Sequence, residues 1–191
     1  MAAVLTFFFD PLCPFTWRAS QWLREVRRQQ PLDVQWRFFS LAEAHGSPNE
    51  LMRAPLRMAA LARREGGNDA VDRVYLALGT AIHERGVDAR DQAALEQAFE
   101  RALQEGDLDR DLLQRALADP STWEDVLADH DEARERYGAY GVPWLVLGEQ
   151  TFGFNGPIMS EVPRGETAVE LWRHLSWTLA QPYFYELKRE R

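Results

Sequence analysis

The stretch Val4-Leu-Thr-Phe-Phe-Phe-Asp-Pro-Leu-Cys-Pro-Phe-Thr-Trp17 decides the fold, because a mostly apolar run leads directly into the only cysteine of the 191-residue chain. Residues 4–9 are too few for a membrane span and rich in aromatic and β-branched side chains, which predicts a strand buried on both faces. Asp10-Pro11 ends this strand. Apolar residues then recur with helical spacing, which predicts a helix from Phe15 to about Gln29.

Cys13 is therefore predicted to lie at, or just before, the first turn of this helix. Pro14 suits that position, because its missing N–H would have no helical partner there. Free backbone N–H groups and the positive end of the helix dipole favour an anion, so the sequence predicts a lowered pKa for the Cys13 thiol and makes it a candidate nucleophile. The alternative is a small, inert core cysteine. Because one cysteine cannot form an intramolecular disulfide, redox chemistry here needs a second thiol from outside.

The composition predicts a globular protein of one domain, or of one domain with an insertion, since 46% of its residues are hydrophobic and seven are tryptophans. A net charge of −8 and a pI near 5.1 argue against a surface for nucleic acids or anionic membranes. Residues 1–9 carry no basic segment, and no apolar stretch approaches the ~20 residues of a membrane-spanning helix. The sequence therefore predicts a soluble, cytoplasmic protein.

The rest of the chain alternates between α/β and purely helical patterns. Residues 33–39 predict a second strand, parallel to the first, and residues 40–48 a connection. Five short helices are then predicted, the last opened by a capping box at Ser121-Thr-Trp-Glu124. They cover about residues 51–65, 71–85, 95–106, 108–117 and 121–137.

The α/β pattern resumes near the C-terminal end. Two short strands at 143–147 and 150–154 are predicted to form a hairpin with its turn at Gly148-Glu149, and a helix follows over 165–180. The order predicts one α/β domain formed by residues 1–48 and 139–191, interrupted by a helical insertion subdomain at 49–138.

This order, with Cys-Pro at a helix start and Gly141-Val-Pro143 before the third strand, resembles the thioredoxin fold in its DsbA-like form, an α/β fold with an α-helical insertion. More closely, the chain resembles the actinobacterial mycothiol-dependent nitroreductase family over nearly its whole length. The motifs that carry this resemblance are Phe9-Asp-Pro-Leu-Cys-Pro14, Ile82-His83, Gly141-Val-Pro143, Gly156-Pro157, Val162-Pro-Arg-Gly-Glu166, Leu171-Trp172 and Phe184-Tyr-Glu-Leu-Lys-Arg189.

The resemblance implies a thiol-dependent oxidoreductase, monomeric or homodimeric, that uses mycothiol or another low-molecular-weight thiol to reduce a disulfide or a nitroaromatic electrophile. The chain departs from the family at Thr16, where members with the full motif carry a second cysteine. A dithiol mechanism is excluded, and an external thiol must release the product from Cys13. We expect no flavin or nicotinamide cofactor, because no Gly-x-Gly-x-x-Gly follows a strand, and no metal site, because the histidines lack ligand spacing.

Each candidate site residue has a structural alternative. Thr16 lies one turn after Cys13, so its hydroxyl and N–H are candidate donors to the sulfur, or it is an ordinary first-turn threonine. Pro143 matches the family's cis-proline, in which case Val142 presents backbone groups to a bound thiol; the alternative is a trans proline at a strand start. The other candidates for thiol or substrate binding are Pro14, Phe15, Trp17, His83 and Trp144.

Three of these candidates are aromatic residues close to the motif prolines. Phe15, Trp17 and Trp144 are predicted to form a wall for a flat substrate. His83 matches the family's Ile-His and is a candidate for lining the cleft, the alternative being a surface histidine. For Asp10 we favour capping of the turn or helix over a role as a base, since a nearby carboxylate would raise the thiol pKa.

Two other functions are compatible with the same fold. A hydroxyl near the helix start also resembles kappa-class glutathione transferases and related isomerases, in which case Thr16 activates a thiol cofactor and Cys13 is dispensable. In a non-enzymatic alternative, Cys13 is S-thiolated and the change alters a partner surface.

Overall fold

A mixed β-sheet forms the centre of the protein. The computed structural model describes residues 3–46 and 49–188. Within these ranges four strands form one sheet in the order β2-β1-β3-β4. β1 (Ala3–Phe9) pairs in parallel with β2 (Leu32–Phe38), which confirms the predicted strand-helix-strand unit. Val4 is 42% exposed, so the prediction that this strand is buried on both faces is wrong at its beginning.

The second half of the sheet is antiparallel. β3 (Trp144–Leu147) pairs with β1, and β4 (Phe154–Asn155) pairs with β3. The predicted strand at 150–154 with a two-residue turn is wrong, because Asn155 opposes Trp144 and a longer loop joins the strands. Gly153 lies in this loop, and a Cβ added there would be 2.1 Å from Trp144 Nε1, so the loop passes too close to the indole for any other residue at this position.

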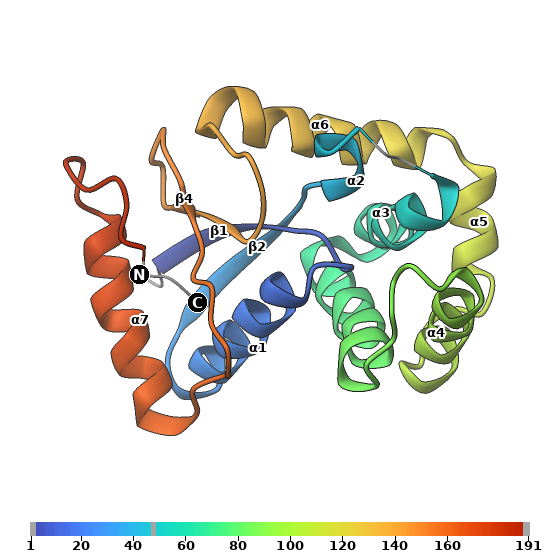
Figure 1. Cartoon of the computed structure of the whole chain (residues 1–191), viewed down its shortest axis with the longest axis horizontal. Helices are drawn as coiled ribbons and strands as arrows, with labels where there is room; N and C mark the ends of the chain where they lie inside the picture. The colour runs from blue at the N-terminus through green and yellow to red at the C-terminus, as the bar shows by residue number, and fades with distance from the viewer. Residues whose placement is uncertain (1–2, 47–48, 189–191) are drawn as a thin grey trace.

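Two helices cover the sheet beside the thiol-bearing turn. α1 (Pro14–Gln29) connects β1 to β2, and α7 (Gly165–Leu179) packs against it (Figure 1). Trp22 links them, since its Nε1–H donates to the Ala168 carbonyl at 3.0 Å and its ring lies 6.0 Å from that of Trp172. Both helices agree with their predicted ranges.

Among the remaining helices, α3 and α6 both pack against β2, and Ala133 of α6 also belongs to the apolar cluster with Phe8 and Val146 (Figure 1). All five predicted helical segments are present, but the predicted connection at 40–48 also contains a short helix that Ser40 caps. The elements are α2 (Leu41–Ala44), α3 (Glu50–Gly79), the π-helix η1 (Thr80–Glu84), α4 (Gln92–Glu105), α5 (Leu112–Ala118) and α6 (Ser121–Tyr137).

Glycines and caps set the ends of the helical segments. The predicted break at Gly66-Gly67 is confirmed, because both residues have non-helical backbone angles and divide α3 into two helices; Gly67 has a φ of +67° that other residues rarely adopt. The second of the two predicted helices, over 71–85, continues into η1. The predicted capping box of α6 is wrong, because the Ser121 hydroxyl donates to the Asp119 carboxylate, which also accepts from the Ser121 N–H. α6 ends at the left-handed Gly138, as predicted.

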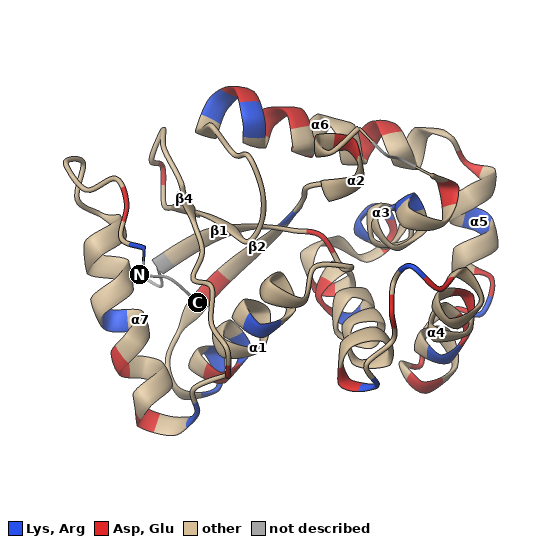
Figure 2. Cartoon of the chain, in the orientation of Figure 1, with Lys and Arg blue, Asp and Glu red and all other residues tan. Residues whose placement is uncertain are grey.

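The side chains of β1 alternate between two apolar clusters. Phe7 and Phe9 face the main core, which α1, α3 and β2 share, whereas Phe8 faces a smaller cluster on the opposite face of the sheet. Lys and Arg alternate with Asp and Glu along the surrounding helices (Figure 2). None of the helices within the described ranges combines the length and the apolar character that crossing a bilayer requires.

Candidate thiol active site

Cys13 occupies the N-cap of α1, which confirms its predicted place in the chain. Its backbone is extended, with φ −86° and ψ 115°, and Pro14 is the first helical residue. The Cys13 N–H donates to the Asp10 carbonyl at 3.0 Å, and the Cys13 carbonyl accepts from the Trp17 N–H at 3.0 Å. The turn over residues 10–13 is therefore fixed from both sides of the cysteine.

The thiol points toward the loop before β3. Cys13 Sγ lies 3.7 Å from the Val142 carbonyl oxygen, and the Val142–Pro143 peptide bond is cis. Only 5% of the cysteine is exposed. The smaller apolar cluster surrounds it, with Phe15 and Tyr137 packed at its edge, and consists of Phe8, Cys13, Phe39, Ala133, Ala139, Val142, Trp144 and Val146.

The burial of Cys13 contradicts the prediction that the pKa of its thiol is lowered. Burial raises the pKa of the Cys13 thiol above its ordinary value, and the nearby Asp10 carboxylate raises it further. Hydrogen bonding from the Thr16 hydroxyl and from the N–H groups of Thr16 and Phe15 lowers the pKa, but by less. The prediction of a lowered pKa is therefore wrong, because removing the thiolate from water outweighs the donors at the helix start.

Thr16 is completely buried beneath the thiol. Its hydroxyl has no hydrogen-bond partner among the described residues, although it lies close enough to the thiol to lower the pKa of Cys13. A threonine in the first turn of a helix commonly bonds to its own backbone or to water. Here the hydroxyl makes neither bond within the described residues, so it is a donor that a thiolate at Cys13 could accept from.

Asp10 caps two backbone segments of the site. One carboxylate oxygen accepts from the Leu12 N–H and the other from the Leu41 N–H, both at 2.9 Å. The carboxylate thus connects the cysteine turn to the start of α2, which agrees with the favoured capping role. Burial raises the pKa of Asp10 to about 6, although these two hydrogen bonds and nearby His45 lower it.

We expect this carboxyl to make the stability of the protein depend on pH. The ordinary pKa is 3.8, so the folded protein binds the Asp10 proton more tightly than the unfolded chain does. This stabilisation is complete below pH about 4 and is lost as the pH rises through about 6, in total about 3 kcal/mol. Asp10→Asn cannot titrate. The stability difference between the wild type and this variant should therefore fall between pH 4 and 7 in urea unfolding; a constant difference would refute the assignment.

Trp17 and His83 lie on another side of the cysteine turn. Trp17 belongs to the main core, where its Nε1–H donates to Glu84 at 2.8 Å and its ring lies 5.9 Å from the His83 ring, nearly parallel to it. His83 Nε2–H donates to the Pro11 carbonyl at 2.8 Å, and burial lowers the pKa of this histidine. η1 thereby attaches the helical segment to the turn that carries Cys13.

The predicted aromatic wall of three rings is wrong. Phe15 and Trp144 border the thiol cluster, but Trp17 packs in the main core against Gly79, where an added Cβ would lie 2.1 Å from the indole. Trp17 and Trp144 are also at most 5% exposed. The aromatic side chain that is open to solvent here is Tyr140, which is 68% exposed and packs edge-on against Trp144.

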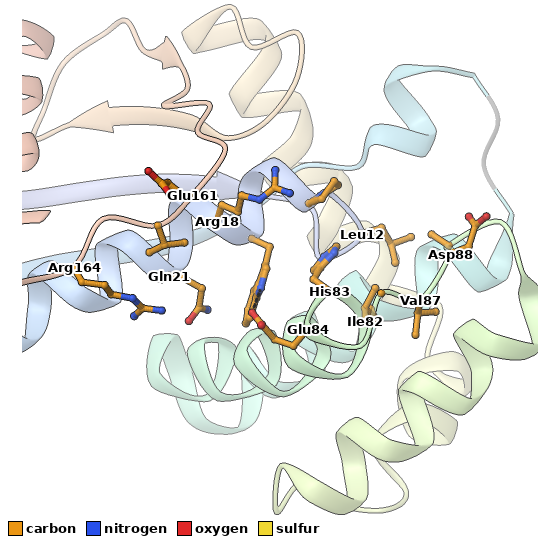
Figure 3. Close-up of a pocket in the computed structure, with 15 residues that line it drawn as sticks. Leu12, Arg18, Gln21, Ile82, His83, Glu84, Val87, Asp88, Glu161 and Arg164 are labelled. Atoms are coloured by element: carbon orange, nitrogen blue, oxygen red, sulfur yellow. Dashed lines mark hydrogen bonds between the residues drawn. The ribbon is translucent and has the colours of Figure 1, made fainter. Parts of the chain in front are cut away.

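A cavity of about 640 Å³ adjoins the cysteine turn. It lies along α1, facing η1 and the loop after it on one side and the segment before α7 on the other (Figure 3). Three of the candidate binding residues, Pro14, Trp17 and His83, line it, but Cys13 does not. Arg18 and Gln21, which were not among the predicted residues, also line it, and their spacing from Pro14 and Trp17 places all four on one helix face.

Comparisons with known proteins agree with this architecture. The chain is 36% identical to the uncharacterized protein Rv2286c of Mycobacterium tuberculosis over 97% of this chain and 81% of the relative. A putative protein-disulfide isomerase from Pseudomonas syringae has a TM-score of 0.61 at 18% identity, covering 88% of this chain and 93% of its own. A probable DsbA oxidoreductase from Streptomyces coelicolor has a TM-score of 0.57 at 18% identity, covering 97% and 94%.

A 2-hydroxychromene-2-carboxylate isomerase has a similar structure, with a TM-score of 0.62 at 18% identity and coverage of 91% of this chain and 93% of its own. These structural similarities establish the DsbA-like thioredoxin fold and nothing about the reaction. Residues 12–189 match the family described as "Rv2466c-like: Mycothiol-dependent nitroreductase Rv2466c". The chain, with its Cys-Pro turn and DsbA-like fold, therefore belongs to the Rv2466c-like family of mycothiol-dependent nitroreductases.

Proposed function

We propose that this protein is a cytoplasmic oxidoreductase in which Cys13 exchanges with disulfides and a low-molecular-weight thiol, mycothiol in the first instance, supplies the electrons. The observation that carries this proposal is the place of the thiol, which caps α1 and faces the Val142 carbonyl at 3.7 Å. Free N–H groups at the helix start favour the thiolate during reaction. The Val142 backbone is positioned beside any group attached to the sulfur.

The proposed reaction needs one protein thiol and two external thiols. The Cys13 thiolate attacks a disulfide, forms a mixed disulfide with one half and releases the other half as a thiolate. The low-molecular-weight thiolate then attacks the substrate sulfur of that mixed disulfide, which restores the Cys13 thiolate. A second external thiol reduces the resulting small mixed disulfide. Two electrons thus pass from two thiols to the disulfide substrate. Reduction of a nitro group to a nitroso group would likewise consume two thiols, which supply two electrons and two protons, and would release water and a disulfide.

The raised pKa of Cys13 limits which partners react quickly. At neutral pH the buried sulfur is mostly protonated, so a freely diffusing alkylating agent meets little thiolate. A disulfide held against the Val142 backbone remains close to the sulfur whenever the proton leaves, which is the advantage of a bound over a dissolved reactant. We therefore expect selectivity for disulfides that bind rather than high general reactivity.

The geometry favours Cys13 over Thr16 as the reacting group. The Thr16 side chain is completely buried in the first turn of α1, and Cys13 caps the same helix. A thiol cofactor could reach the Thr16 hydroxyl only if the side chains that bury it moved. The role we assign to Thr16 is to donate to the sulfur, which stabilises the thiolate both as nucleophile and as leaving group.

Intact-protein mass spectrometry with mycothiol disulfide tests the proposal. Because Cys13 is the only cysteine, any disulfide adduct reports on this residue. We expect a single adduct whose rate of formation rises with pH, with an inflection above the ~8.5 of a free cysteine, and which reduced mycothiol then removes. An adduct that mycothiol cannot remove would support a sensor module instead. An adduct that forms only in urea would identify Cys13 as an inert core residue.

A further inference from the structure

The segment that follows β2 packs over the thiol cluster and is fastened along both of its sides. This strap, residues 38–44, connects β2 to α2 (Figure 1). Three of its apolar side chains pack in the cluster that contains Cys13, namely Phe39, Leu41 and Ala44. Phe39 is completely buried. A change that loosened the strap would therefore open the surroundings of the sulfur to solvent.

On one side the strap is fastened to α6. Its backbone is extended at Ser40, with φ −94° and ψ 115°, and an extended backbone directs successive N–H groups to opposite sides. The N–H groups of Phe38 and Ser40 therefore both face α6. They donate to two adjacent residues of that helix, the first to the Asp129 carboxylate at 3.0 Å and the second to His130 Nδ1 at 3.2 Å.

On the other side the strap is fastened to the end of β1. The Phe39 N–H donates to the Phe9 carbonyl, and the Leu41 N–H donates to the Asp10 carboxylate, both at 2.9 Å. Four successive N–H groups thus hold the strap, two on each side. Three of the four acceptors are ionisable side chains, so the attachment of the strap depends on pH.

His130 can hold Ser40 only while its imidazole is neutral. Because Nδ1 accepts the Ser40 N–H, the proton of the neutral ring is on Nε2. In the imidazolium both nitrogens carry protons, and Nδ1–H would face the Ser40 N–H instead of accepting from it. His130 is buried, and its ring lies 4.5 Å from that of Phe39 between the ring centres. Two donors facing each other in this place are unfavourable, so protonation pushes the strap away from α6.

The charges around His130 favour the neutral ring. Burial lowers its pKa below the ordinary 6.5 and Arg134 acts in the same direction, whereas the carboxylates of Asp131 and Glu43 raise it by less. The other charged side chains at this junction are paired with carboxylates, Arg37 and Arg63 with Asp129, and Arg53 with Glu43. The closed strap is therefore fully favoured above pH about 6.5 and loses stability as the pH falls below it.

Asp10, which holds the next N–H of the strap, responds to acid in the opposite direction. Burial raises the pKa of its carboxyl to about 6, and nearby His45 lowers it by less. A proton is thus bound more tightly by Asp10 in the closed strap than in an open one, so mild acid favours closure at this point. Opening on acidification can come from His130 and not from Asp10.

We propose that His130 is a pH-sensitive latch, whose neutral imidazole holds the strap closed over Cys13 and whose protonation releases Ser40 and makes the sulfur more accessible. The latch controls access to the sulfur and not the reaction that follows. The proposal therefore does not depend on the redox function of Cys13, and any thiol reagent can report on it.

The reaction of Cys13 with 4,4′-dithiodipyridine, relative to that of N-acetylcysteine at the same pH, measures this access. Both thiols are mostly protonated between pH 7 and 5 and lose thiolate in the same proportion. We expect the rate ratio of the wild type to rise at least about fivefold over this range. His130→Asn places an amide oxygen close to the position of Nδ1 and does not titrate, so its ratio should lack this rise.

His45→Asn is the matched control, since His45 is an exposed histidine at the end of α2, and it should keep the rise of the wild type. An equal rise in the wild type and in His130→Asn would overturn the proposal. Such a result would point to Asp10, whose carboxylate raises the pKa of Cys13 until it is protonated. A constant ratio in the wild type would also overturn it.

Heteronuclear NMR of the wild type gives a second measurement that needs no variant. The ring nitrogens of His130 and the amide of Ser40 should titrate together, with a midpoint below 6.5, while circular dichroism stays unchanged. Titration of His130 without a change at Ser40 would show that the ring does not hold the strap. Loss of the circular dichroism signal over the same range would show that acid unfolds the whole protein. Either result would overturn the latch.

Discussion

The Cys13→Ser variant should lose disulfide exchange completely, because the chain has no second sulfur nucleophile. A serine hydroxyl at the same N-cap cannot attack a disulfide and leave again under these conditions. We expect mycothiol-dependent reduction of 2-hydroxyethyl disulfide to fall by at least about three orders of magnitude, with no mass adduct from mycothiol disulfide. Serine is a good N-cap residue, so the fold should be retained and circular dichroism should be unchanged.

Thr16→Val is the companion variant, since valine has nearly the shape of threonine without the hydroxyl. Loss of this donor removes a hydrogen bond to the thiolate, worth about 1.5–3 kcal/mol for a charged acceptor. Exchange should therefore slow by roughly ten- to a hundredfold while an adduct still forms, and the inflection of its rate should move to higher pH. The reverse result, with transfer retained in Cys13→Ser and abolished in Thr16→Val, would establish the Thr16 transferase alternative.

The sequence predicted the position of Cys13 because that position depends on local signals. A strand, the Asp-Pro pair that ends it, a Cys-Pro pair and an amphipathic helix lie within thirty residues. Each of these signals depends only on residues close to it in the sequence. The pKa of the same thiol depends on side chains that are distant in the chain. Ala133, Ala139 and Val142 lie more than 100 residues away, and only the folded sheet brings them onto the sulfur. The local sequence therefore predicts the hydrogen-bond donors at the start of α1, but it does not predict the burial of the Cys13 sulfur.

The same distinction between local signals and contacts of distant residues explains the other differences between the predicted and the observed structure. The short α2 depends on Ser40 and on the Asp10 carboxylate, which belong to two separate strand ends. In the β3–β4 loop, Gly153 packs directly against the Trp144 indole, a contact that short sequence patterns do not encode. The cavity beside the cysteine turn is lined by three separate segments, so neither Arg18 nor Gln21 could be assigned to it before the helical segment and the segment before α7 were in place.

Asp129→Ala should cause the largest loss of stability among single carboxylate replacements near the site, about 3–5 kcal/mol. Asp129 is 3% exposed and joins three elements. One oxygen accepts from the Phe38 N–H at 3.0 Å and from Arg63 at 2.5 Å, and the other pairs with Arg37 at 2.8 Å. Alanine leaves the last N–H of β2 unpaired and two guanidiniums without their shared anion. Urea unfolding at pH 7 measures the change.

Asp131→Ala is the control, because Asp131 is exposed on the same helix two residues later and its replacement should change stability by less than about 0.5 kcal/mol.

Asp129→Ala should also change the accessibility of the Cys13 thiol. The Phe38 N–H donates to the Asp129 carboxylate, and Phe39 is the next residue in the chain. The Phe39 ring belongs to the apolar cluster that buries Cys13. Weaker attachment at this point should expose the sulfur more often, so alkylation of Cys13 below the unfolding transition should accelerate in Asp129→Ala and not in Asp131→Ala. A destabilised variant with an unchanged alkylation rate would show that α6 and the thiol cluster open independently.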